Sequence, residues 1–90
     1  MLSRDEFVNE VLRVARERGY TLEYNARNNR RQIDFGHKKL HAGHLENLYP
    51  AILHRGAHIP SLIEHVAPGR PCSHRPMREI IEQLRYEGKC

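Results

Sequence analysis

Residues Tyr20 to Phe35 have the sequence YTLEYNARNNRRQIDF. Large apolar residues alternate with polar ones in segments 20–24 and 31–35, and an asparagine-rich segment separates the two. A period of two residues is typical of a half-buried strand, and asparagine tolerates the positive φ that tight turns need. We therefore predict a β-hairpin here. One face of this hairpin would carry the side chains of Tyr20, Leu22, Tyr24, Ile33 and Phe35.

The segment before the hairpin predicts an amphipathic helix from about Arg4 to Arg18. Ser3 and Glu6 have the spacing of a capping box, in which each side chain accepts from the backbone amide of the other residue. Gly19 favours the left-handed conformation that ends many helices. The helix would bury a stripe of apolar residues at helical spacing, formed by Phe7, Val8, Val11, Leu12 and Ala15.

The segment after the hairpin predicts two or three short helices. Residues 37–41 could first add a short third strand. An apolar period of 3.6 residues runs from Leu45 to Leu53, but Pro50 interrupts it, so a helix either begins at Pro50 or kinks there. Residues 60–66 and the stripe Met77, Ile80, Ile81 and Leu84 predict the remaining helices. We thus expect one small α+β domain over residues 1–90.

The composition excludes several classes of protein. Arg4 and the acids after it precede any apolar run, which argues against a secretory signal peptide, and the apolar runs are too short for a membrane span. Two cysteines, Cys72 and Cys90, do not make a disulfide framework. We expect reduced thiols, a cytoplasmic protein, no membrane partner and no cofactor.

The formal charge of +4 is concentrated between Tyr24 and Leu45, where five cations accompany one acid. Arginine can donate two parallel hydrogen bonds to a phosphate, and nearby aromatic rings could stack on unpaired bases. We therefore predict a small non-enzymatic module that contacts the backbone of RNA or DNA through a basic hairpin. The five cations, named here the basic island, are Arg27, Arg30, Arg31, Lys38 and Lys39.

A second hypothesis is a non-enzymatic inhibitor or adaptor whose basic island docks on an acidic or RNA-facing surface of a nucleic-acid-processing complex. The apolar stripes of the middle and final helices could exceed what one hairpin covers, and a homodimer or a larger complex would bury the excess. Such a protein would have no affinity for free nucleic acid.

All seven histidines lie between His37 and His74, several of them three or four residues apart. Such spacing suits a metal on a helix face. However, glycines interrupt the pairs and nearby cations would repel a metal ion, so no metal site is predicted.

A third hypothesis is catalytic. His37 follows Gly36 at the expected strand end beside Lys38 and Lys39, so it could act as general base on a ribose 2′-hydroxyl, with His41 as the acid. A helix followed by a hairpin resembles, in element order, the HicA-type messenger-RNA-cleaving toxins, whose domain is related to the double-stranded-RNA-binding fold. These toxins carry a glycine-serine-histidine stretch, to which Gly36-His37 corresponds in part. The resemblance implies RNA cleavage that uses His37.

Overall fold

The computed structural model describes residues 2–89 and begins with helix α1 (Arg4–Glu17). The predicted capping box is present at its start. Ser3 Oγ accepts from the Glu6 amide at 3.2 Å, and Glu6 Oε1 accepts from the Ser3 amide at 2.8 Å. The apolar stripe of α1 is buried, as its spacing predicted.

Strands β1 (Thr21–Asn25), β2 (Arg30–Asp34) and β3 (Lys39–His41) form an antiparallel sheet in the order β1-β2-β3. The hairpin and the third strand are thus confirmed. Leu22 lies opposite Ile33, and Ile33 lies opposite Leu40 in the next strand. These three residues share one face of the sheet, and Ile33 and Leu40 are fully buried.

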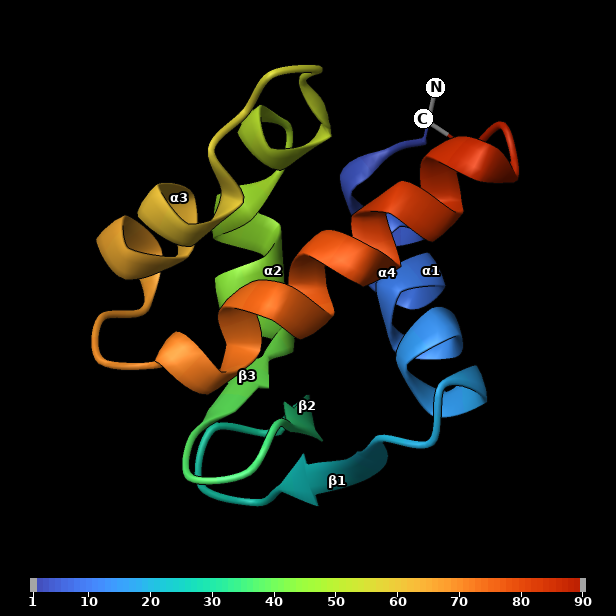
Figure 1. The fold of residues 1–90 in the computed structure, drawn as a ribbon. Helices are drawn as coiled ribbons and strands as arrows, with labels where there is room; N and C mark the ends of the chain where they lie inside the picture. Colours follow the sequence, from blue (N-terminus) through green and yellow to red (C-terminus); the bar gives the residue numbers. More distant parts are fainter. Residues whose placement is uncertain (1, 90) are drawn as a thin grey trace.

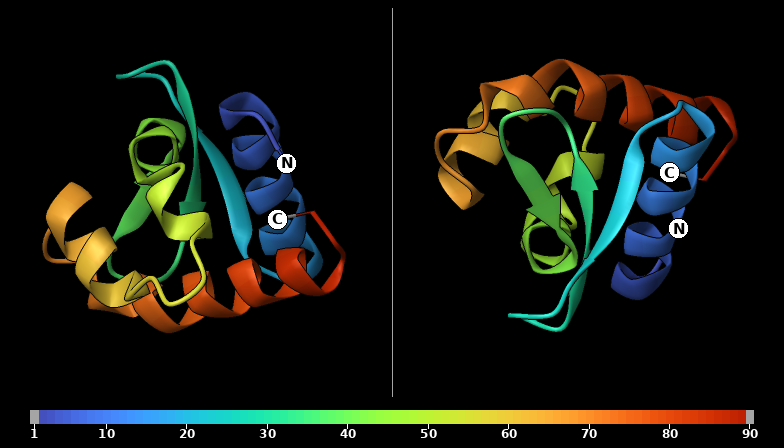
Figure 2. Two further views of the ribbon diagram at one scale, coloured as in Figure 1. Left: turned by 90° about the horizontal axis from the view of Figure 1, so that it is seen from above. Right: turned by 90° about the horizontal axis from the view of Figure 1, so that it is seen from below.

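Helices cover that face of the sheet. Helix α1 contacts β1, and α2 (Ala42–Leu48) contacts β2 and β3; seen from below, α2 lies behind β3 (Figure 2, right). The last helix, α4 (His74–Tyr86), runs across the molecule and packs on α1 and on α3 (Ile59–Val66) (Figure 1). The result is the expected α+β architecture.

The apolar stripe of α4 is fully covered within the chain. It packs in the same core as α1, the sheet and α2. The excess apolar surface expected on this helix is therefore not present, and α4 gives no support to a homodimer. The buried residues are Met77, Ile80, Ile81 and Leu84.

The expectation that a helix begins or kinks at Pro50 is wrong. Helix α2 ends at Leu48, and the 3-10 turn η1 (Ala51–Leu53) follows Pro50. Tyr49 has an extended backbone, with ψ of 141°. A residue before proline avoids the helical region, so the helix ends before it reaches Pro50.

A second 3-10 turn, η2 (Pro71–Ser73), connects the loop after α3 to α4. No helix within residues 2–89 has the length and apolar character that a bilayer crossing requires.

Candidate functional site

The basic island lies at two ends of the sheet. The turn between β1 and β2 carries Arg27, and the loop between β2 and β3 carries Lys38, at the opposite end of β2. A strand rises about 3.3 Å per residue, so the ends of the five-residue β2 are about 13 Å apart. Residues 25–31, the hairpin tip, and the segment 36–39 are therefore separate positive regions.

Ion pairs compensate two charges of the basic island. Arg30 forms a salt bridge with Glu46 of α2. Lys39 Nζ lies 2.9 Å from Glu23 Oε1 of β1, and this carboxylate raises the pKa of Lys39. Each acid comes from a different element than its cation, and Glu23 reaches Lys39 across β2, so the spacing along the sequence does not reveal these pairs.

The charges of the other three cations remain uncompensated in the described part of the chain. Arg31 Nη2 donates to Asn9 Oδ1 of α1 at 2.6 Å, and this neutral partner orients the guanidinium without cancelling its charge. Arg27 and Lys38 are exposed, and neither forms an ion pair within residues 2–89. Within the described residues these three cations form no ion pair, although Arg31 shares a hollow with Asp5 and Glu46.

The aromatic rings near the basic island are those of Tyr20, Tyr24 and Phe35, and only Tyr24 is largely exposed. Tyr20 and Phe35 pack edge to face with ring centroids 5.1 Å apart, and Phe35 is buried. Tyr24 is 62% exposed and lies directly opposite Arg31 in the register of the hairpin. The hairpin tip thus presents one accessible ring beside an uncompensated arginine.

Two further cations join these regions from distant segments. Arg16 and Glu17 of α1 and Arg31 of β2 line a hollow of about 370 Å³ between α1 and the sheet. Arg70, in the loop before η2, donates from Nε to the Lys39 carbonyl oxygen at 2.8 Å. Sequence reasoning missed both, because only the packing of α1 and of the loop on the sheet brings them close.

His41 is the N-cap of α2, and its ring stacks on that of His44 with centroids 3.6 Å apart. Each Nδ1 accepts from the backbone amide of the other residue, so the proton of each neutral ring lies on Nε2. Burial is the main cause that lowers the pKa of His41, and it lowers that of His44 to about 4.

This arrangement opposes the acid role predicted for His41. A general acid must carry an extra proton, whereas the helix cap requires an unprotonated Nδ1. Because Nε2 bears the proton, the pair is also unsuited to holding a metal through that atom. Among residues 2–89, no three His, Cys, Asp or Glu side chains are grouped as a metal site would need.

His37 is exposed in the loop between β2 and β3, next to Gly36, whose φ is +122°. Its predicted role as a base stays a prediction. Cys72 forms no disulfide within residues 2–89, and Cys90 lies outside the described residues, so the expectation of reduced thiols stays a prediction.

No family model, curated protein or solved structure matches this chain.

Proposed function

We propose that this protein is a small cytoplasmic module that binds single-stranded RNA or DNA through its hairpin tip. The observation that carries this proposal is the exposed ring of Tyr24 opposite Arg31, with Arg27 at the turn beside them. Unpaired bases stack on exposed aromatic rings, and arginine binds the phosphates that flank them.

The ion pairs determine how steeply this binding is expected to depend on the salt concentration. If Arg27 and Arg31 of the hairpin tip each contact one phosphate, and the strand also reaches Lys38 in the segment 36–39, the slope of the logarithm of the association constant against the logarithm of the salt concentration is about −2, from about −0.7 per contact on a single strand. If all five cations of the basic island contacted a duplex, the slope would be about −4 to −5. We therefore expect a shallow slope, because only the cations without ion pairs would contact phosphates.

The test is a fluorescence-anisotropy titration with labelled oligouridylate, oligothymidylate and a duplex of mixed sequence at several salt concentrations. We expect micromolar binding to the single strands, with a slope near −2. Tyr24→Leu should weaken binding by about 1–3 kcal/mol, the usual contribution of one stacked base. Arg27→Glu together with Arg31→Glu should abolish it.

Matched controls are Tyr86→Leu and Arg78→Glu on α4. Tyr86 is 91% exposed, so its removal tests whether any surface tyrosine has the same effect. Equal losses in the hairpin and control variants, or no binding at low salt, would overturn the proposal. The same samples run on a gel should show intact RNA; cleavage that His37→Ala removes would favour the toxin-like alternative instead.

A further inference from the structure

A second surface lies far from the sheet, around η1 and the loop that leads to α3, shown in yellow-green at the top of Figure 1. Two hollows open there, of about 640 Å³ and 410 Å³. Both are lined by His54 and Arg55, so the two hollows are neighbours on one surface within residues 49–62. We name it the η1 groove.

Contacts with the rest of the molecule hold the η1 groove in place. Arg85 of α4 donates from Nη2 to the carbonyl oxygens of Leu53 at 3.4 Å and of His54 at 2.9 Å. Tyr49 donates its hydroxyl to the Leu2 carbonyl oxygen at 2.7 Å. A groove that is already formed costs a partner less conformational entropy on binding.

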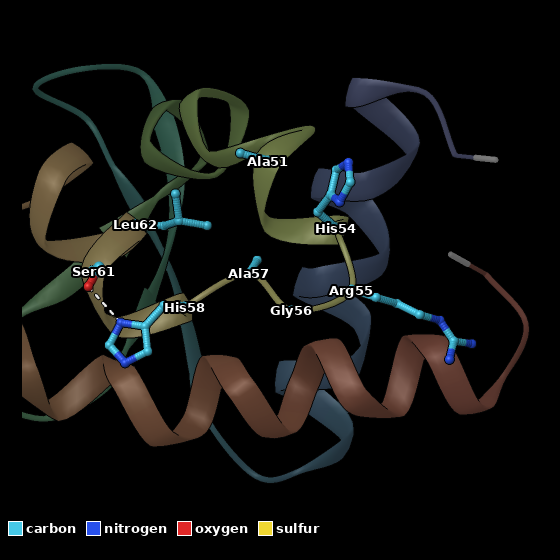
Figure 3. A pocket seen from close by; sticks show the side chains of 8 residues that line it. All are labelled: Ala51, His54, Arg55, Gly56, Ala57, His58, Ser61 and Leu62. Atoms are coloured by element: carbon cyan, nitrogen blue, oxygen red, sulfur yellow. Dashed lines mark hydrogen bonds between the residues drawn. The ribbon is translucent and has the colours of Figure 1, made fainter.

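The walls are mainly apolar. Pro50 and Leu53 line the larger hollow, and Ala51 and Leu62 face each other across the smaller one (Figure 3). At one end of the smaller hollow, His58 Nδ1 and Ser61 Oγ form a hydrogen bond of 2.6 Å.

The charge of the η1 groove has one sign. Arg55 is exposed; its backbone lies at the end of the smaller hollow opposite His58, and its side chain extends outward from that end (Figure 3). No Asp or Glu lines either hollow, and within residues 2–89 neither Arg55 nor Arg85 forms an ion pair. An occupant with a negative charge beside an apolar group would complement this surface, and a basic occupant would be repelled.

We propose that the η1 groove docks a peptide segment of a partner protein in which an aliphatic or aromatic side chain neighbours an Asp or Glu. The hollows have volumes in the range of about 300–1,000 Å³ that suits ligand pockets. The apolar side chain would enter the hollow beside Leu53, and the carboxylate would pair with Arg55. A nucleic-acid strand suits this surface less, because it needs several cations in series and the walls here are apolar.

This inference is independent of the nucleic-acid proposal, since the groove and the hairpin tip share no residue. With both sites occupied, the chain would link a protein to a nucleic acid. It would then act as an adaptor with two different surfaces.

The experiment selects random peptides displayed on phage for binding to the 90-residue chain, and calorimetry then measures the affinity of the selected peptides after synthesis. We expect the selected peptides to contain an Asp or Glu next to an apolar residue. Arg55→Glu, an exposed change that leaves the core intact, and Leu53→Asp should each reduce affinity about tenfold or more. Arg27→Glu, at the hairpin tip, should leave it unchanged. Backbone amide NMR shifts on peptide addition should be confined to residues 49–62.

The inference would be overturned if no peptide were selected or if the selected peptides lacked Asp and Glu. It would also be overturned if Arg55→Glu left the peptide affinity unchanged. Amide shifts outside residues 49–62 would also overturn it. Oligouridylate that shifts these amides, instead of those of the hairpin tip, would assign the groove to nucleic acid. The results with peptides leave the nucleic-acid proposal untouched, because that proposal is measured by the loss of oligonucleotide binding in Tyr24→Leu. The oligouridylate result would overturn both proposals.

Discussion

His41 and His44 cap the start of α2 reciprocally, each Nδ1 accepting from the backbone amide of the other residue at 3.2–3.3 Å. Ser, Thr, Asp or Asn with Glu three residues later usually occupies these positions. An imidazole nitrogen accepts only while it is unprotonated. The first turn of α2 is therefore stabilised by two side chains that lose this ability in acid.

The first prediction is a loss of stability in mild acid. Burial, together with the charges of Arg30 and Arg70, lowers the pKa of His41, and Glu46 opposes this; the pKa of His44 falls to about 4. A histidine with a lowered pKa in the folded state stabilises fully above about pH 6.5 and loses this contribution as the pH falls towards 4. We expect the free energy of unfolding to drop by about 1–2 kcal/mol over this window, allowing for partial solvent exposure.

Urea denaturation followed by circular dichroism, at pH steps from 7.5 to about 4, measures this change. The double variant His41→Asn, His44→Gln keeps cap-forming side chains that do not titrate, so its stability should vary less over the same window. His65→Gln, on exposed α3 surface, should retain the full drop. A double variant as acid-sensitive as the parent would contradict the assignment.

The second prediction concerns Gly43. A Cβ at this position would lie 2.8 Å from Cε1 and 3.0 Å from Nδ1 of His41. Glycine to alanine within a helix normally stabilises by about 0.5–1 kcal/mol, but here the methyl group would displace the capping ring. We expect Gly43→Ala to destabilise the protein by about 1 kcal/mol, the usual cost of a lost cap.

The matched control places the same change in a His41→Ser background. Serine is smaller and caps from a different position, so Gly43→Ala should be neutral or stabilising there. Equal effects in both backgrounds would show that the His41 ring is not the cause.

The third prediction tests the ion pair between Arg30 and Glu46, and it rests on the nucleic-acid proposal. Glu46→Gln releases the Arg30 charge at the hairpin tip. We expect tighter binding of oligouridylate and a salt slope steeper by about 0.7, equivalent to one added phosphate contact. Glu79→Gln, which frees Arg75 on α4, is the control and should change neither quantity. An unchanged slope in Glu46→Gln would place Arg30 outside the binding surface.

The fourth prediction concerns the link between α1 and α4. Arg13 bonds Glu10 at 2.5 Å and Glu17 at 2.9 Å on α1, and it reaches Glu87 after α4. Partly exposed pairs contribute little singly, but a shared arginine couples the two segments, so Arg13→Met should cost about 1 kcal/mol. Denaturation at low and high salt should show a smaller cost at high salt, because salt screens the pairs.

Arg16→Met is the control for this effect. Arg16 is exposed one turn further along α1 and forms no ion pair within residues 2–89. Its removal should change stability by less than about 0.5 kcal/mol. A similar cost at both positions would point to lost side-chain packing rather than ion pairing.

The elements with local signals were predictable from the sequence. The capping box at Ser3, the alternation around the turn and the stripe of α4 each depend on neighbouring residues, and the structure confirms all three. The prediction failed at Pro50, where proline marks a break in the apolar period but does not show on which side the helix continues. The sequence also did not single out His41 as a helix cap, because imidazoles rarely occupy that position.

The sequence by itself therefore determined the helices at either end, the hairpin between them and the α+β class, since capping, periodicity and turn chemistry act over a few residues. Only the tertiary structure decided which charges remain free. Antiparallel pairing places Arg27 and Lys38 at opposite ends of β2, and packing brings Glu46 to Arg30 and Glu23 to Lys39. It also forms the η1 groove. These contacts depend on how separate elements pack together, and the spacing of residues along the chain carries no record of that packing.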